Sequence, residues 1–208
     1  MKKKQLAIVL SKLKEIENPV PELEQYTTPG DLAAEILNLA HLNGDIEGRT
    51  VIDLGCGSGR FVIGSVLLGA KKAIAVEKYN NVIQTAKKNL EKTEKITGKN
   101  LSEKIQFVCC DVTEAKIKGD TVIQNPPFGI QKKHADRIFL EIALEMADTV
   151  YSLHRHYYKT RKFIKEFAEQ RKAKIEKIIK FKFRIPYMFR FHKKESVKFD
   201  VDLFIIKR

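Results

Sequence analysis

The sequence predicts an α/β fold with a mostly parallel, doubly wound sheet and helices on both faces. From residue 50 onward, short apolar runs alternate with segments whose apolar residues recur at helical spacing. A chain of 208 residues suffices for one full α/β domain. Neither an internal repeat nor a low-complexity linker divides it. We therefore expect a single domain over residues 1–208.

Two helices are expected before the alternating region. The first covers residues 4–17, because apolar side chains recur at helical spacing at Leu6, Val9, Leu10, Leu13 and Ile16. Pro19 and Pro21 follow and cannot continue a helix. The second helix covers about residues 31–42, and Pro29 fits the preference for proline at a helix start.

The remaining elements follow in regular order. Strands are expected at 50–54, 72–77, 105–110, 120–124, 149–154, 174–185 and 197–206. Helices are expected at 59–68, 79–96, 135–148 and 160–171. Residues 184–196 are too long for a tight hairpin turn and are interpreted as a loop. Right-handed crossovers would bring the carboxyl ends of the parallel strands to one edge.

Composition limits the function classes. Hydrophobic residues make up 43% and charged residues 31%, which is typical of a packed core. The sequence contains no run of about 18 apolar residues, so no membrane span is predicted. The basic N-terminus lacks the features of a secretory signal, so we expect a cytoplasmic protein. Cys56, Cys109 and Cys110 form no C-x-x-C pair, so neither a metal site nor a disulfide framework is expected.

The net charge of +13 favours a polyanionic partner. The excess is uneven, because Lys and Arg far outnumber Asp and Glu from Lys159 onward. A nucleic acid is the expected partner. A lysine-rich surface without such a role is the alternative.

A glycine-rich turn follows the expected strand 50–54. Its sequence is Asp53-Leu54-Gly55-Cys56-Gly57-Ser58-Gly59. Glycines permit a tight turn and a close ligand, and such a turn can bind a dinucleotide. Asp53 would repel a pyrophosphate but tolerate a sulfonium and a zwitterionic amino acid. The turn therefore favours S-adenosylmethionine over NAD.

Acids end the next two strands. Glu77 ends the strand 72–77, where its carboxylate can accept hydrogen bonds from a ribose diol. Asp111 follows the strand 105–110 and could accept from an adenine amine, while the N–H of Val112 could face the ring. Each acid alone could be a helix cap or a turn residue. Three such strand ends together indicate a cofactor site.

The residues Asn125-Pro126-Pro127-Phe128 follow the strand 120–124. The Asn125 side-chain carbonyl and the Pro126 carbonyl could both accept from a planar amino group, aiming its lone pair at a methyl donor. Pro127 adds rigidity because proline fixes φ. Phe128 could stack on a base, which would have to be unpaired or flipped out. An ordinary Pro-Pro turn is the alternative.

Together these motifs resemble the methyltransferase-like-five family of archaeal and eukaryotic small-subunit ribosomal RNA adenine-N6 methyltransferases. The resemblance covers nearly the whole chain. It rests on Leu23–Thr28, Asp53–Gly57, Asn125–Gly129, Ala143–Ala147, Val150–His154 and Phe191–Lys194. It implies a Rossmann-like class I methyltransferase fold, with a seven-stranded sheet whose last strand is antiparallel. It also implies N6-methyladenosine as the product.

The resemblance implies further site residues. The N-terminal region 1–42 would close over the cofactor. Cofactor contacts would come from this region and from the strand ends. The residues are Gln25, Tyr26, Thr28, Asp53, Gly55, Gly57, Ser58, Arg60, Glu77, Asp111, Val112 and Asn125. Ser58 and Arg60 depart from the eukaryotic residue types. Substrate contacts would come from Phe128 and from the loop residues Phe191, His192, Lys193 and Lys194.

A partner protein is also implied. Eukaryotic members of this family work with a small zinc-binding activator that pairs with an exposed edge strand. Residues 105–110 would form that edge here, and no central Lys or Pro guards them.

Other acceptors on the same scaffold stay open at this point. Guanine-N2 methyltransferases of ribosomal RNA can carry a Phe at the position of Phe128, and protein glutamine methyltransferases usually carry a Tyr. The basic C-terminal half favours RNA. A non-catalytic RNA-binding protein is the third alternative, and the intact acids and Asn125 argue against it.

Overall fold

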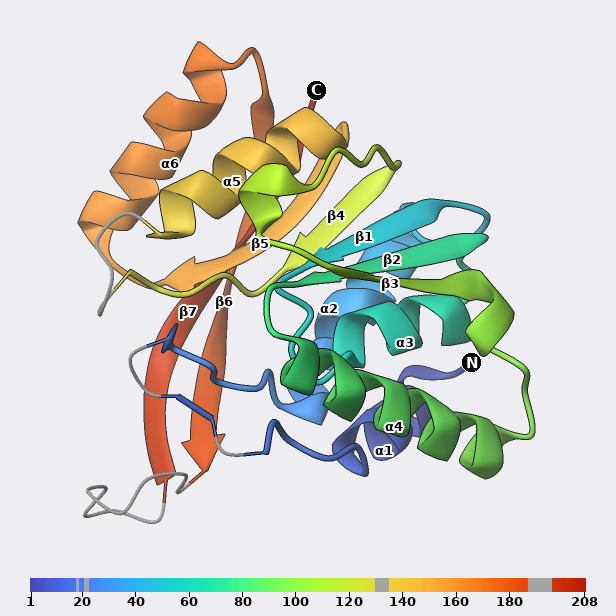
Figure 1. Cartoon of the computed structure of the whole chain (residues 1–208). Coiled ribbons are helices and arrows are strands. Elements are labelled where there is room, and N and C mark those ends of the chain that lie inside the picture. Colours follow the sequence, from blue (N-terminus) through green and yellow to red (C-terminus); the bar gives the residue numbers. More distant parts are fainter. Residues whose placement is uncertain (18, 21–22, 130–134, 187–195) are drawn as a thin grey trace.

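The computed structural model describes residues 1–17, 19–20, 23–129, 135–186 and 196–208 (Figure 1). Its centre is a seven-stranded sheet in the order β3-β2-β1-β4-β5-β7-β6. The strands are β1 (Thr50–Leu54), β2 (Lys72–Glu77), β3 (Ile105–Cys109), β4 (Thr121–Gln124), β5 (Thr149–Arg155), β6 (Lys174–Pro186) and β7 (Ser196–Lys207). β1 to β5 run parallel, and β7 lies antiparallel between β5 and β6. The predicted fold class is confirmed.

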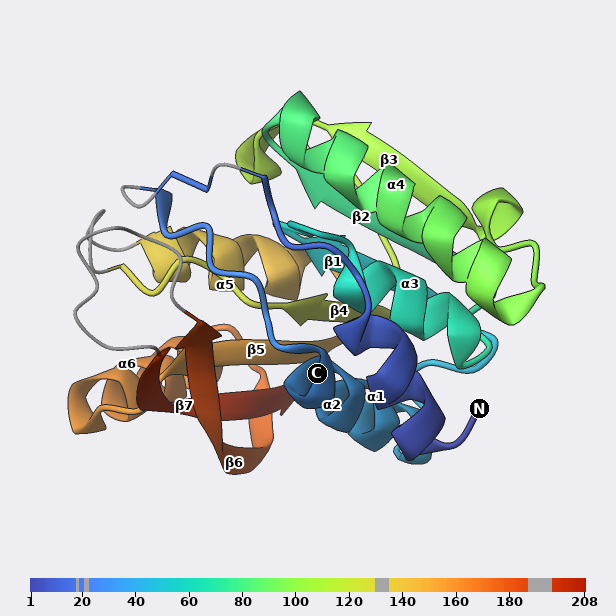
Figure 2. The same cartoon turned by 90° about the horizontal axis from the view of Figure 1, so that it is seen from below.

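Helices cover both faces of the sheet, as Figures 1 and 2 show. α1 (Lys3–Ser11), α2 (Gly30–Leu42) and α3 (Arg60–Leu67) share one hydrophobic core with alternate residues of β1 and β2, among them Val51 and Ala73. α5 (Ala135–Met146) and α6 (Tyr158–Gln170) share the other core with the intervening residues, among them Ile52 and Ile74. Since side chains alternate along a strand, one strand serves both cores. α4 (Asn80–Thr97) and two short 3-10 helices, η2 (Ser102–Lys104) and η3 (Val112–Glu114), complete the described elements.

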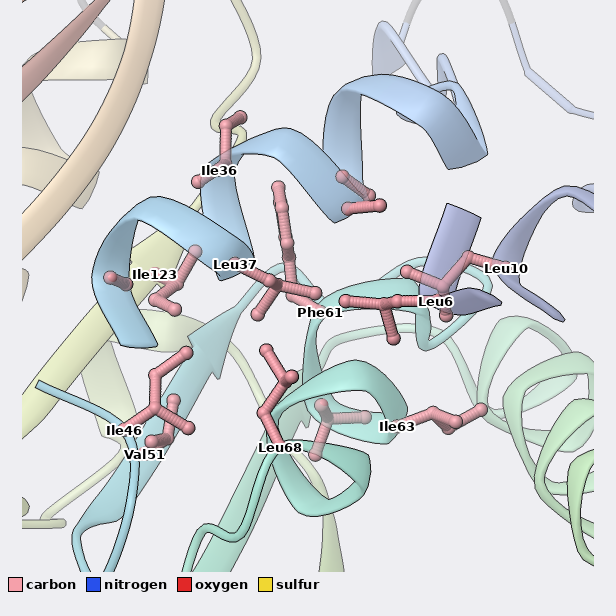
Figure 3. Close-up of a cluster of buried hydrophobic side chains, with 14 of the residues drawn as sticks. Leu6, Leu10, Ile36, Leu37, Ile46, Val51, Phe61, Ile63, Leu68 and Ile123 are labelled. Carbon is pink, nitrogen blue, oxygen red and sulfur yellow. The ribbon is translucent and has the colours of Figure 1, made fainter. Parts of the chain in front are cut away.

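The first core joins the N-terminal helices to the sheet (Figure 3). Leu6 and Leu10 of α1 are fully buried together with Ile36 and Leu37 of α2. Full burial of one such side chain contributes roughly 1.5–3 kcal/mol. The N-terminal region is therefore part of the folded domain, and it fixes where the chain enters the segment before α2.

Most predicted bounds agree with the structure within one or two residues, but the first helix was predicted too long. α1 ends at Ser11, not at residue 17. Leu13 and Ile16 are buried, as their apolar pattern indicated, in a chain that has left the helix. Tertiary hydrogen bonds replace the helical ones: Asn89 pairs with both the N–H and the carbonyl of Lys14, at 2.8 and 2.9 Å.

The predicted loop 184–196 is shorter than expected. β6 continues to Pro186 and β7 begins at Ser196, so the two strands pair over nearly their whole length. None of the described helices is long and apolar enough to cross a membrane.

Gly30 is predicted to be indispensable for the contact between α1 and α2. A Cβ at this position would lie 2.5 Å from the main-chain nitrogen of Ser11 and 2.6 Å from its Cα. Alanine usually favours a helix over glycine by up to about 1 kcal/mol. Here we expect Gly30→Ala to lower the free energy of unfolding by about 1–3 kcal/mol, because backbone must move.

Urea unfolding followed by circular dichroism measures this change. Lys88→Ala, on the exposed side of α4, is the control and should stay within about 0.5 kcal/mol of the parent. A Gly30→Ala variant as stable as the parent would show that α1 and α2 do not meet as described.

Candidate active site

A cavity of about 470 Å³ opens at the carboxyl ends of β1, β2 and β4. This volume lies in the range of small-molecule sites. The segment that joins α1 to α2 passes across the same edge (Figure 1), and its residues 23–28 line the cavity. Predicted site residues that line the wall are Gln25, Tyr26, Thr28, Gly55, Gly57, Ser58, Arg60, Glu77, Asp111, Val112, Asn125 and Pro127. The structure thus brings together residues that are up to 102 positions apart in sequence (Gln25 and Pro127).

The glycine-rich turn forms the floor of this cavity. Gly57 has φ 53°, in the left-handed region, and its N–H donates to Glu77 Oε2 at 3.2 Å. Gly59 has φ 82°, and a Cβ there would lie 3.0 Å from Ala86 Cβ of α4. Glycine is required at Gly59 for both reasons, because a side chain would be strained and would push α4 away.

Asp53 lies behind the turn and does not line the cavity. Its side chain is 1% exposed, and its Oδ2 accepts from the N–H of Val62, in the first turn of α3, at 3.2 Å. Burial raises the pKa of Asp53 to about 8, while the Val62 hydrogen bond opposes the rise. The carboxyl group holds the start of α3 and therefore helps to fix the glycine-rich turn, which lines the cavity. The sequence argument had placed it beside the ligand.

Glu77 lies on the wall and supports the turn as well. Its Oε2 accepts from Gly57 and its Oε1 accepts from the N–H of Tyr79, both at 3.2 Å. Burial raises the pKa of Glu77, and the backbone hydrogen bonds from Tyr79 and Gly57 oppose this. Each carboxylate oxygen can accept more than one hydrogen bond, so both the cap role and a ligand role are open to it.

Asp111 is the N-cap of η3. Its Oδ1 accepts from the N–H and the hydroxyl of Thr113, at 3.1 and 2.8 Å, and its Oδ2 accepts from Lys78 Nζ at 3.1 Å. These hydrogen bonds, led by those from Thr113, lower the pKa of Asp111. The adjacent Val112 is buried and lines the cavity. The carboxylate is ionised and fixed in place.

Asn125 stands at the border of the cavity. Its Nδ2 donates to Thr28 Oγ1 at 3.0 Å. Its Oδ1 is buried and has no hydrogen-bond partner among the described residues. A buried acceptor left unpaired costs about 1–3 kcal/mol, so it indicates a donor that arrives with a ligand. An amino group is such a donor.

Glu24 is a site residue that sequence reasoning missed. The side chain is buried, its Oε2 accepts from the N–H of Phe128 at 2.6 Å, and its backbone has φ 51°. A left-handed conformation is costly for a residue with a Cβ, and such strain is concentrated at functional sites. The Leu23–Thr28 motif contains Glu24, but no compositional signal separates it from its neighbours.

Arg60 binds the protein's own backbone. Its Nε donates to the carbonyl of Leu10 at 3.2 Å and its second terminal nitrogen to that of Leu13 at 3.0 Å, while the first contacts Ser58 Oγ at 3.4 Å. Burial lowers the pKa of Arg60. The guanidinium therefore ties the end of α1 to the glycine-rich turn, and this explains why α1 stops early.

Phe128 does not line the main cavity. Its ring meets Phe183 and Phe199 edge-on, at centroid distances of 5.9 and 5.7 Å. Phe183 and Phe199 stack on each other at 5.3 Å, so the β6–β7 hairpin supports the loop after β4. Pro126 is buried and also lies off the wall. The predicted substrate residues Phe191, His192, Lys193 and Lys194 lie outside the described residues.

Comparisons with known proteins agree with this geometry. Residues 28–152 match the family model of the methyltransferase small domain. The chain is similar to an uncharacterized protein of Methanocaldococcus jannaschii, with 42% identity over 100% of this chain and 95% of that protein. It is also similar to the rRNA N(6)-adenosine-methyltransferase METTL5 of Danio rerio, with 36% identity over 97% of each chain.

A solved structure from Pyrococcus horikoshii has a similar fold throughout. It is described as a candidate RNA methyltransferase. The TM-score is 0.91 at 41% identity, covering 100% of this chain and 98% of that one.

The buried carboxyl group of Asp53 predicts a pH-dependent stability. Its pKa rises from about 3.9 in the unfolded chain to about 8 in the fold. Folding therefore takes up a proton between these values. This contribution is full below about pH 4 and is lost as pH rises to about 8, by up to roughly 1.4 kcal/mol per pH unit. Asp53→Asn removes it, so the variant should gain stability relative to the parent as pH rises.

Urea unfolding at pH 5, 6.5 and 8 measures that difference. Asp148→Asn, at an exposed carboxyl group, is the matched control. A difference between Asp53→Asn and the parent that stays constant across these pH values would show that Asp53 is ionised in the fold.

Proposed function

We propose that this chain, which belongs to the methyltransferase small-domain family and within it to the group of rRNA N(6)-adenosine-methyltransferases, transfers a methyl group from S-adenosylmethionine to the N6 amino group of an adenosine in RNA. The proposed RNA is small-subunit ribosomal RNA. The buried, unpaired Oδ1 of Asn125 is the observation that carries the proposal.

The side chain of Asn125 would select an amino group by accepting a hydrogen bond from it. Because its Nδ2 is bound to Thr28, its buried Oδ1 is left as an acceptor with a fixed direction. An exocyclic amine that donates to Oδ1, and to the carbonyl of Pro126, becomes more tetrahedral and exposes its lone pair. The cofactor supplies an electrophilic methyl group when bound. The rate gain would come from positioning and preorganised dipoles.

The acids on the wall suit the proposed cofactor. Glu77 would accept from a ribose diol, Asp111 and Val112 would contact the adenine ring, and the backbone of Gly55 and Gly57 would face the amino-acid part. Gln25, Tyr26 and Thr28 would close over it, and Ser58 and Arg60 would hold the turn. Asp53 would act through that turn. The lining carboxylates, Glu24, Glu77 and Asp111, outnumber the lining cations, Arg60 and Lys78, and this balance is compatible with a sulfonium cation.

Phe128 would stack on the target base, and Phe191, His192, Lys193 and Lys194 would contact the RNA around it. The net charge of +13 supports a polyanionic substrate. A cytoplasmic location is part of the proposal, and the three free thiols, Cys56, Cys109 and Cys110, fit a reducing compartment.

A small zinc-binding activator is proposed as partner at the edge strand. β3 lies at the end of the sheet and pairs with β2. Phe107 in the middle of β3 is half-buried, and Lys87 lies over its ring, 5.8 Å from the centroid. A partner strand could pair with the free side of β3 and cover this ring.

Loss of the Asn125 side chain should abolish transfer and spare the cofactor. Methyl transfer from labelled S-adenosylmethionine to unmodified small-subunit rRNA, followed by nucleoside mass spectrometry, should give N6-methyladenosine. Asn125→Ala should lower kcat by about 10²–10³-fold, the range for removal of one preorganised polar group. Calorimetry should show unchanged cofactor affinity, and Asn81→Ala, at an exposed position of α4, is the control.

Other products would overturn specific parts of the proposal. N2-methylguanosine or labelled protein would refute adenine N6 as the acceptor. Loss of cofactor affinity in Asn125→Ala, with kcat retained at saturating cofactor, would place Asn125 in the cofactor site alone.

The edge-strand proposal predicts a stable heterodimer. After co-expression with a small zinc-binding activator, size-exclusion chromatography with light scattering should show a 1:1 complex. Phe107→Lys should dissociate it, because a charge would be buried in the new interface. Leu42→Lys changes a 74% exposed residue at the end of α2 and should leave the complex intact. A monomer in every sample would contradict the proposal.

A further inference from the structure

Two exposed tyrosines lie where β5 passes into α6. Tyr157 is 54% exposed and Tyr158 is 83% exposed. Neither ring is part of the core, although Tyr157 is the N-cap and Tyr158 the first residue of α6, a helix that buries Ile164 and Phe167. Large exposed aromatic rings side by side in sequence, at the carboxyl end of a sheet strand, indicate a contact surface.

Tyr157 is connected to the loop after β4 through Arg155 and Phe199, and Tyr158 is the next residue along the chain. The guanidinium of Arg155 lies 4.2 Å from the ring centroid of Phe199 and 5.3 Å from that of Tyr157, and it donates to Tyr157 Oη at 2.8 Å. Phe199 in turn contacts Phe128 edge-on. Burial raises the pKa of Tyr26, which lines the main cavity, and the charge of Arg155 opposes this rise. The surface therefore adjoins the candidate active site.

A second, smaller cavity of about 210 Å³ lies on the same side. Phe128 and Gly129 line it together with Asp136, Arg137, Lys159 and Phe163. Arg137 stacks on Phe163, 3.9 Å from the ring centroid. Asp136 is the one carboxylate among the lining residues, and it lies 3.8 Å from His154 Nδ1. The cavity thus combines aromatic faces with two exposed cations beside Phe128.

The segment that carries the tyrosines is held rigidly. Asp202 of β7 is fully buried and accepts two hydrogen bonds from Arg161, each at 2.7 Å. It also pairs with His156 Nδ1 at 2.9 Å. Because His156 and Arg161, on both sides of Tyr157 and Tyr158, are fixed to β7, the backbone of this segment needs little further ordering on binding.

We propose that Tyr157, Tyr158, Arg137 and Lys159 form a second RNA subsite, where the tyrosine rings stack on an unpaired nucleotide next to the target base and the cations contact its phosphates. This rests on the proposed function only in taking RNA as the substrate. Stacking platforms combined with cations are typical of single-stranded nucleic-acid sites, and the charge is complementary. The subsite would select adenosines that lie in single-stranded RNA.

Fluorescence anisotropy with a labelled single-stranded RNA fragment, and with the matched duplex, tests the subsite. Tyr158→Ala should weaken binding of the single strand by about 10-fold or more and leave duplex binding unchanged. Tyr158→Phe should restore binding, because stacking needs the ring and not the hydroxyl. Leu42→Ala is the control, because Leu42 lies near the opposite edge of the sheet. Asp45, three residues after Leu42, accepts a hydrogen bond through its carbonyl from Thr121, at the start of β4.

Kinetics separate the subsite from the proposed reaction. Tyr157→Ala and Tyr158→Ala should raise KM for RNA with kcat and cofactor affinity retained. Unchanged KM and unchanged anisotropy in both variants would overturn the subsite, even if the parent methylates RNA. Loss of binding to a partner protein with RNA binding intact would also overturn it. RNA binding that depends on Tyr158, in a parent that produces no methyladenosine, would support the subsite and refute the proposed function.

Discussion

The position of the loop after β4, which carries Asn125 and Phe128, depends on hydrogen bonds from a segment about 100 residues earlier in the chain. Thr28 accepts from Asn125, and Glu24 accepts from Phe128, three residues further along the same loop. That segment is itself placed by α1, whose end Arg60 binds, and by α2, which begins at Gly30 directly after it. The packing of the N-terminal helices therefore determines the position of Asn125 and Phe128 through two hydrogen bonds.

This dependence explains several costly features. The left-handed backbone at Glu24 costs on the order of 1 kcal/mol, yet it aims the carboxylate at Phe128. Two buried polar atoms without a partner among the described residues, Thr27 Oγ1 and Asn125 Oδ1, belong to residues that line the cavity. Stability alone would favour satisfying them. Their persistence at the cavity is consistent with ligand groups that complete the hydrogen bonding.

Much of the fold could be predicted from the sequence, because hydrophobic periodicity and turn residues determine it locally. β1 and β2 have the predicted bounds, and Asn125 follows β4 beside β1 as the doubly wound order required. α1 could not be bounded, since Arg60 and Asn89 supply hydrogen bonds that no local pattern encodes. The apolar pattern at Leu13 and Ile16 reported burial correctly but not conformation.

The candidate site could also be predicted only in part from the sequence. Strand ends are local features, so Gly57, Glu77 and Asp111 could be found, and the structure places them on one cavity wall. Whether a carboxylate faces the ligand or the backbone is a tertiary property. For that reason the sequence could not separate Asp53, which supports α3 behind the cavity, from Glu77, which supports the turn and also lines the cavity. Glu24 was missed because its role depends on a partner 104 residues away.

The edge of the sheet is divided electrostatically at Asn125. On the side of β1 to β3, the carboxylates that line the cavity, Glu24, Glu77 and Asp111, outnumber the two lining cations, Arg60 and Lys78. On the side of β5 and α6, Arg155, Arg137 and Lys159 dominate, accompanied by aromatic rings. A cationic methyl donor is attracted to the first side and a polyanion to the second. The two would meet at residues 125–129 after β4, which carry no charged side chain, so an uncharged amino group can be bound there without desolvating a charge.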